Sequence, residues 1–125
     1  ALPPGSYVAR SFNNDTYVKV AESSTFTVSG ASSTSVATNK SSYTTAESVQ
    51  VTYNGMFGST LDWISIAPAG SGVSAITMYV YTGGGASGTA SFSMAGVTPG
   101  SYVARAYFNN DYILRAESPA FTLTP

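Results

Sequence analysis

Apolar and polar residues alternate along most of the chain, and Gly, Ser, Asn and Pro interrupt the alternation at short intervals. Residues 48–53 alternate in this way, and so do residues 76–81 and 90–94. A period of two places successive side chains on opposite faces of a strand. Residues 61–67 carry apolar side chains on both faces, as in a central strand that is covered on both sides. The pattern therefore predicts strands joined by turns, with almost no helix.

The strands predicted after residue 40 are short and regularly spaced. Counted from a first strand near Tyr43, there are about seven of them, roughly 8–12 residues apart, which is typical of a β-sandwich. We therefore predict an all-β fold, an immunoglobulin-like antiparallel β-sandwich over residues 40–125. Residues 29–39 are small and mostly polar, so we expect a linker there.

The beginning of the chain recurs near its end. Residues 4–10 and 99–105 both read PGSYVAR, and FNND at residues 12–15 recurs at residues 108–111 after a shift of one residue. Tyr7 and Tyr102 lie 95 residues apart. That period suits a whole small domain, because solenoid repeats are roughly 20–50 residues long. We interpret residues 1–28 as the C-terminal hairpin of a preceding repeat, so the chain is expected to come from a tandem array.

An isolated two-stranded hairpin is marginally stable in water. Tyr7, Phe12, Tyr17 and Phe26 would therefore need cover from another surface. We predict that the chain self-associates through residues 1–28, by strand addition or strand exchange with a second copy. The alternative is that this segment folds back on its own domain as extra strands.

Four segments occur in an order that resembles a known group of domains. They are YTTAESVQVTY at residues 43–53, DWISI at 62–66, YVYTGG at 79–84 and PGSYVAR at 99–105. The order resembles the immunoglobulin-like, SKICH-like modules of secreted microbial hydrolases and other multidomain proteins. The resemblance implies an accessory sandwich with no single agreed ligand. Tyr102 also fits the tyrosine-corner position of such folds.

Composition removes several classes of function. The chain has no Cys and no His, so it lacks thiol nucleophiles, disulfides, imidazole bases and zinc sites of the Cys/His type. Its five Lys and Arg residues are scattered and the net charge is −1, which argues against nucleic acid and anionic membrane surfaces. No segment approaches the roughly 20 apolar residues of a membrane helix. We predict that the protein is not an enzyme. Its composition, which is rich in Ser, Thr and Gly, favours an extracellular or cell-surface location.

Tyr79 and Tyr81 are the first candidate ligand-binding residues. They share one strand face, opposite a predicted core set of Ile76, Met78 and Val80. Two exposed rings at this spacing form an apolar patch that could stack on sugars. One alternative is that a neighbouring domain covers the two tyrosines. The other is that they are present only because aromatic residues favour strands.

Asn109, Asn110 and Asp111 form the most distinctive polar cluster. Their side-chain oxygens suit sugar hydroxyls or Ca²⁺, and a calcium site would use Asp111, with Asp15 in the first copy. The alternative is a hairpin turn, because Asn and Asp tolerate positive φ. Trp63 is predicted to be a core ring that packs beneath the second sheet.

These observations predict a non-catalytic interaction or spacer module of a secreted or surface repeat protein. Its expected partners are a second copy of itself or neighbouring repeats. The alternative function is a lectin-like module that binds glycans through the surface tyrosines and the Asn-Asn-Asp loop.

Overall fold

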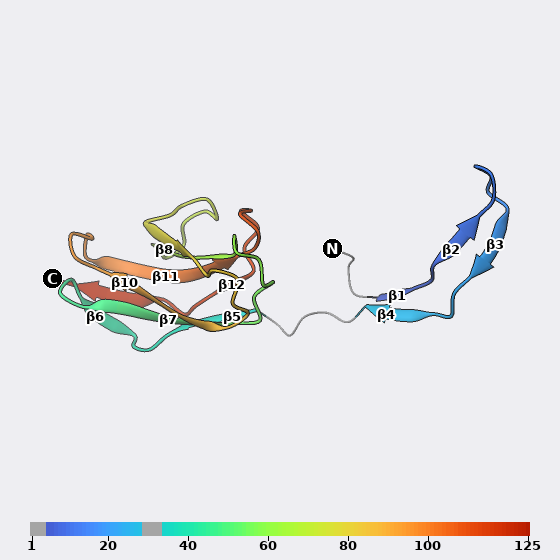
Figure 1. The fold of residues 1–125 in the computed structure, drawn as a ribbon. Helices are drawn as coiled ribbons and strands as arrows, with labels where there is room; N and C mark the ends of the chain where they lie inside the picture. Colours follow the sequence, from blue (N-terminus) through green and yellow to red (C-terminus); the bar gives the residue numbers. More distant parts are fainter. Residues whose placement is uncertain (1–4, 29–33) are drawn as a thin grey trace. The chain divides into compact units, whose positions relative to one another are not determined.

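A computed structural model describes residues 5–28 and 34–125. The chain divides into two compact units, which we call unit 1 (residues 1–31) and unit 2 (residues 32–125). Figure 1 labels the strands of both units. Each unit is considered by itself below.

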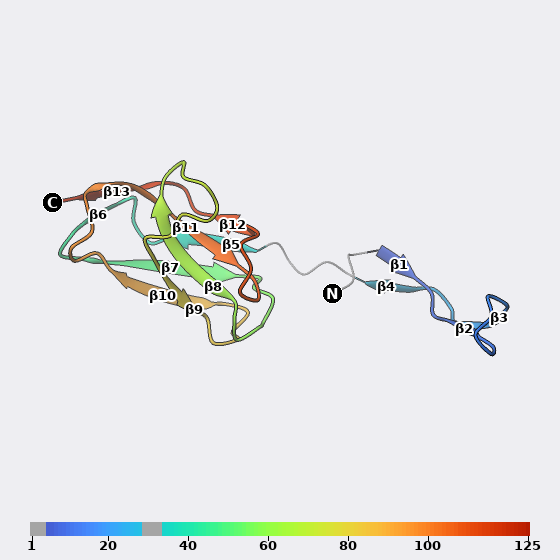
Figure 2. The ribbon, with the colours of Figure 1, turned by 90° about the horizontal axis from the view of Figure 1, so that it is seen from above.

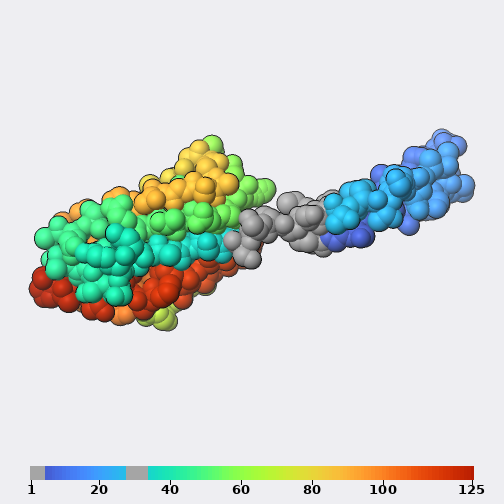
Figure 3. All heavy atoms as spheres, turned by 90° about the horizontal axis from the view of Figure 1, so that it is seen from below, coloured from blue at the N-terminus to red at the C-terminus, as the bar shows by residue number. Residues whose placement is uncertain are grey.

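Unit 2 is a sandwich of two sheets, in which the described residues form nine strands. The smaller sheet has the order β10-β7-β5, and the larger has the order β6-β13-β11-β8-β9, with β12 also paired to β11. All pairings are antiparallel except that of β13 with β6. Figure 2 shows the two layers from above, and the outer surface of β5 and β7 is towards the viewer in Figure 3. The strands are β5 (Ser35–Thr38), β6 (Ser42–Thr44), β7 (Ser48–Asn54), β8 (Trp63–Pro68), β9 (Met78–Tyr81), β10 (Gly88–Ser93), β11 (Gly100–Tyr107), β12 (Ala116–Glu117) and β13 (Phe121–Thr124).

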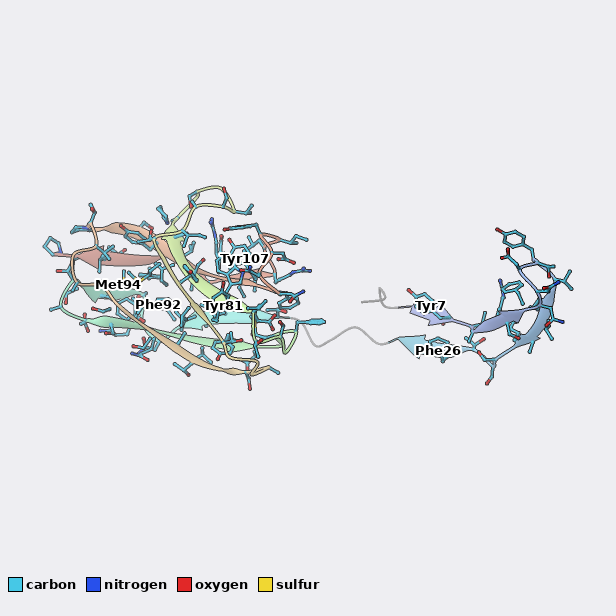
Figure 4. The ribbon with its side chains drawn as sticks, turned by 45° about the horizontal axis from the view of Figure 1, so that its top comes forward. Tyr7, Phe26, Tyr81, Phe92, Met94 and Tyr107 are labelled. Carbon is cyan, nitrogen blue, oxygen red and sulfur yellow. The ribbon has the colours of Figure 1, made fainter. Side chains whose placement is uncertain are left out.

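The core lies between the sheets and follows the two-residue period of the sequence. Val49 and Val51 of β7 are completely buried, while the residues between them are not. Phe92 and Met94 extend the same layer (Figure 4). The larger sheet contributes Ile64 and Ile66 from β8, together with inward residues of β11 and β13. The prediction of an all-β, immunoglobulin-like sandwich is therefore confirmed.

A tyrosine corner fastens β11 to the turn before it. The hydroxyl of Tyr102 donates a hydrogen bond of 2.6 Å to the carbonyl oxygen of Thr98. Its ring stacks on Phe121 of β13, with centroids 6.2 Å apart. The corner predicted at Tyr102 is thus present.

The outer face of the larger sheet is also covered, by the loop of residues 69–77. Arg105 on β11 is buried, and its guanidinium donates to the carbonyl oxygens of Ser71 and Gly72 at 2.7 and 2.8 Å. Tyr107 donates to the carbonyl oxygen of Val73 at 2.6 Å. Burial raises the pKa of the Tyr107 hydroxyl, although the nearby Arg105 partly opposes this, so the group stays a donor at neutral pH. This cover explains why residues 61–67 are apolar on both faces.

Three sequence predictions need correction. Residues 35–38 were assigned to a linker, but they form β5, which pairs with β7 and buries Val36. Residues 29–33 of that linker lie outside the described residues. The sandwich has two more strands than predicted, because β5 was missed and the last predicted strand is divided into β12 and β13. Finally, the predicted core set of Ile76, Met78 and Val80 is only partly buried. Val80 pairs with Ile64 and so shares its inward face, but it is 41% exposed because β9 is an edge strand. Ile76 instead lines an outer concavity with Tyr79 and Tyr81.

Unit 1 is a long hairpin with two paired sections. Its outer section joins β1 (Gly5–Tyr7) to β4 (Phe26–Val28), and its inner section joins β2 (Arg10–Phe12) to β3 (Lys19–Glu22). Both pairings are antiparallel. A bulge between Ser11 and Phe12 shifts the register of the inner section.

Arg105→Ala tests how much the cover of the outer face stabilises unit 2. We expect it to lower the free energy of unfolding by about 2–3 kcal/mol, because two loop carbonyls lose a charged donor and the buried side chain leaves a gap. Trp63, the single tryptophan, reports denaturant unfolding of unit 2 by its fluorescence.

Arg10→Ala is the matched control, since Arg10 makes the equivalent ion pair in unit 1 but is 54% exposed, against 3% for Arg105. It should leave the free energy of unfolding of unit 2, measured by Trp63 fluorescence, within about 0.5 kcal/mol of the parent value. Equal effects of the two substitutions would contradict this account.

Candidate ligand-binding site

A shallow concavity of about 110 Å³ lies on the outer face of the larger sheet. We call it the aromatic site. Strands β8 and β9 supply its base, because Trp63 pairs with Tyr81 and therefore shares its face. The residues that line the site are Trp63, Ile76, Tyr79, Tyr81, Asn110 and Tyr112.

The rings of the site hold one another in place. Trp63 stacks on Tyr107 with centroids 4.1 Å apart and ring planes inclined by 12°. The edges of Tyr79 and Tyr112 meet Trp63 at 5.9 and 5.5 Å. Tyr79 also contacts Tyr81, at 5.6 Å. Figure 4 labels Tyr81 and Tyr107, which stand on β9 and β11.

The tyrosines at the rim remain accessible even though the base is buried. Trp63 is only 4% exposed, and its indole N–H donates to the carbonyl oxygen of Asp111 at 3.2 Å. Tyr79, Tyr81 and Tyr112 are 55%, 41% and 56% exposed. The site therefore consists of a fixed indole base with three amphipathic rings around it.

The loop after β11 brings one amide into the site. The hydroxyl of Tyr81 donates a hydrogen bond of 3.0 Å to Oδ1 of Asn110. Asn109 and Asn110 have φ values of 44° and 61°, and the amide of Asp111 bonds back to the carbonyl oxygen of Phe108. These residues therefore form the turn that was one of the two sequence interpretations. The same turn also places Asn110 beside the tyrosines.

A buried carboxylate fixes this loop. Asp62 is completely buried, and its Oδ1 accepts a hydrogen bond of 3.0 Å from the amide of Asn109. Its Oδ2 accepts from the amides of Gly58 and Ser59 at 2.7 and 3.2 Å. The amide of Asn110 in turn donates to the carbonyl oxygen of Leu61 at 2.9 Å. Asp62 is thus a positioning residue, with both oxygens committed to backbone amides.

The other predicted polar residues serve different contacts. Asp111 pairs with Arg115 at 2.9 Å and also accepts from the amide of Ile113. The side-chain oxygen of Asn109 accepts from the hydroxyl of Ser59. Among residues 5–28 and 34–125, no group of three or more acidic, His or Cys side chains is arranged to hold a metal ion. A calcium site at Asp111 or Asp15 has no geometric support in the described chain.

Sequence reasoning named Tyr79, Tyr81 and Asn110 but missed the other residues of the site. Trp63 was assigned to the core between the sheets, yet it faces outwards, because it alternates with the inward residues Ile64 and Ile66 on β8. Tyr112 directly follows the Asn-Asn-Asp cluster, a signal that could have pointed to it.

Comparisons with known proteins give little further information. No protein-family model and no curated protein matches the sequence. Among solved structures, the chain is similar to one described as the D00-D0 domain of Intimin, with 12% identity and a TM-score of 0.48. The similarity covers 97% of this chain and 79% of that one. No helix in the described part of the chain is long and apolar enough to cross a membrane.

Asp62→Ala tests the anchoring of the loop. Three backbone amides would lose a charged acceptor, so we expect the free energy of unfolding of unit 2 to fall by about 3 kcal/mol. Denaturant unfolding followed by Trp63 fluorescence measures the change. Asp111→Ala is the control, because it breaks a partly exposed ion pair and should cost about 1 kcal/mol or less. If Asp62→Ala costs no more than this control, the anchoring role is wrong.

Proposed function

We propose that this chain is a non-catalytic module from a tandem array of immunoglobulin-like β-sandwiches on a secreted or surface protein. In this proposal residues 5–28 are the closing hairpin of the preceding sandwich. The observation that carries it is a structural repeat: unit 1 reproduces the contacts of β11, β12 and β13 at positions 95 residues earlier.

The strand pairing is the same in both copies. Gly5 pairs with Val28 as Gly100 pairs with Leu123, and Tyr7 pairs with Phe26 as Tyr102 pairs with Phe121. The two ring pairs also match in geometry. Tyr7 and Phe26, labelled in Figure 4, have centroids 6.1 Å apart with planes inclined by 29°. Tyr102 and Phe121 have values of 6.2 Å and 27°.

The polar contacts repeat as well. Nε of Arg10 bonds Glu22 at 2.7 Å, and Nε of Arg105 bonds Glu117 at 2.8 Å. The hydroxyl of Ser23 accepts from the amide of Ala9 at 3.0 Å. The hydroxyl of Ser118 accepts from the amide of Ala104 at 2.9 Å. The two hairpins therefore share their polar contacts as well as their strand pairing.

The turn fixes the register of the repeat. Asn14 and Asp15 have φ values of 44° and 56°, against 44° and 61° for Asn109 and Asn110. The offset of 95 therefore continues through the loop, and the sequence match of the two FNND segments is one residue out. The FNND segments match out of register because Asn and Asp both tolerate positive φ, so either residue type can occupy these positions of the turn. Asp15 corresponds to Asn110, and Tyr17 corresponds to Tyr112.

The described residues of unit 1 include no counterparts of the strands that surround the same hairpin in unit 2. There, β11 pairs with β8, β13 pairs with β6, and their inward residues face the smaller sheet. In unit 1, Phe12 and Phe26 are 48% and 44% exposed. A hairpin of this size gains little stability from its own contacts. These exposed rings support a role in closing another sandwich.

The chemistry of the acidic residues supports a non-catalytic role. Glu22, Glu47, Asp111 and Glu117 are ion-paired, and Asp62 is held by backbone amides. The Lys40 ammonium beside Glu47 holds the pKa of that carboxyl below its usual value, which keeps it ionised. Paired carboxylates of this kind are poor general acids, and the chain has no His or Cys to replace them.

A chimera tests the proposal. Residues 34–98 followed directly by residues 4–28 should fold as a complete sandwich with a cooperative thermal transition. The inward residues of β11 and β13 would be replaced by identical or similar ones, since Ala106 becomes Ser11 and Leu123 becomes Val28. Circular dichroism and the dispersion of amide resonances measure folding.

The controls for the chimera are a chain of residues 34–98 alone and a chimera carrying Tyr7→Ser and Phe26→Ser. Both should be unfolded, because the first lacks β11, β12 and β13 and the second lacks two aromatic rings that fill the core. A chimera that is no better folded than residues 34–98 alone would overturn the assignment of unit 1.

We also propose that the isolated chain self-associates through residues 1–28, because Phe12 and Phe26 of the hairpin are 48% and 44% exposed. Analytical ultracentrifugation should show oligomers of the full chain and monomers of a variant that lacks residues 1–30. Phe12→Ser with Phe26→Ser should weaken association in the same way. Phe57→Ser, which changes an exposed ring of unit 2, should not. Oligomers that survive the deletion would exclude this mode of association.

A further inference from the structure

The aromatic site is not needed to close either sheet, yet it is well organised. Tyr79 and Tyr81 stand on an edge strand and are 55% and 41% exposed, whereas Arg105 on β11 is buried under the loop of residues 69–77. Their rings are held by contacts with Trp63 and with each other. A ligand that packs on them would therefore cost little side-chain entropy.

The polar groups of the site lie at its rim. The Tyr81 hydroxyl donates a hydrogen bond to Oδ1 of Asn110. The two N–H donors of the same amide remain available for other partners. The hydroxyls of Tyr79 and Tyr112 belong to side chains that are more than half exposed. Ring faces with hydrogen-bonding groups at their edge suit a ligand with apolar C–H faces and peripheral hydroxyl groups.

Charge and size narrow the ligand class. The six lining residues include no Asp, Glu, Lys, Arg or His, and the nearby Asp111 and Arg115 neutralise each other. The volume of about 110 Å³ lies below the roughly 300–1,000 Å³ of pockets that enclose a whole ligand. The site therefore suits an uncharged ring held by one face or edge, within a longer chain that stays in solvent.

We propose that the aromatic site binds neutral pyranose sugars with equatorial hydroxyl groups, as in β-1,4-linked gluco-oligosaccharides. Equatorial hydroxyls leave flat C–H faces for the exposed rings of Tyr79, Tyr81 and Tyr112, and they direct the oxygen atoms outwards to Asn110. This binding activity is independent of the array role proposed above. An unfolded chimera would leave it standing, and a failure to bind sugar would leave the array role standing.

The test titrates the full-length chain with cellohexaose and chitohexaose. Binding is followed by the fluorescence of Trp63, which reports the site directly because it is the single tryptophan, and by calorimetry. A saturable change with either neutral oligosaccharide is expected, and oligogalacturonate, an acidic sugar, should give none. The binding should persist in EDTA, since none of the lining residues carries a carboxylate.

Variants assign the binding to the site. Tyr81→Ala and Tyr112→Ala should each weaken binding about tenfold, because each removes a ring face. Tyr17→Ala is the matched control: Tyr17 is the repeat equivalent of Tyr112, is 99% exposed and stands in unit 1, so its loss should leave affinity unchanged. Asn110→Gly keeps the positive φ without strain and should weaken binding through loss of the amide alone.

Thermal unfolding of each variant shows whether the sandwich is intact. If Tyr81→Ala fails to fold, Tyr112→Ala and Asn110→Gly still decide the question. The proposal is overturned if neither neutral oligosaccharide binds, if only the acidic one binds, if EDTA abolishes binding, or if Tyr112→Ala binds as well as Tyr17→Ala.

Discussion

Unit 2 depends on the burial of both faces of β11. Its inward residues Tyr102, Ala104 and Ala106 complete the core, while Arg105 and Tyr107 point the other way and hold the loop of residues 69–77. Tyr107 also supports the indole of Trp63, which forms the base of the aromatic site. One strand therefore joins the core, the covered outer face and the candidate site, so a change in its packing affects all three.

The same constraint explains the importance of unit 1. Its strands carry nearly the same residues as β11, β12 and β13 and adopt the same hydrogen-bonded form. In unit 2 the smaller sheet covers the inner face of β11, the loop of residues 69–77 covers its outer face, and β8 pairs with its edge. A strand whose two faces are buried in a sandwich gains little stability when it stands in a separate hairpin. This is the physical reason for placing unit 1 in an array, where another sandwich supplies those surfaces.

Much of the fold could be predicted from the sequence, because the alternation in residues 48–53 and 90–94 marks one buried face and the PGSYVAR segments mark a repeat. The errors have local causes. β5 has only one buried apolar residue, Val36, so composition suggested a linker. Trp63 lies in a segment that is apolar on both faces, and the two-residue period cannot decide which face is the core. Asp62 gave no signal, because its three partners are backbone amides that leave no trace in the sequence.

The central claim is that residues 5–28 supply the last strands of a sandwich. Complementation between two separate chains tests it most directly. A peptide of residues 1–31 would be titrated into isotope-labelled residues 34–98, which lack β11, β12 and β13. The account predicts saturable binding that converts collapsed amide resonances into the dispersed spectrum of a folded β-protein. A spectrum that stays collapsed at saturating peptide, under conditions in which a peptide of residues 99–125 restores the fold, would contradict it.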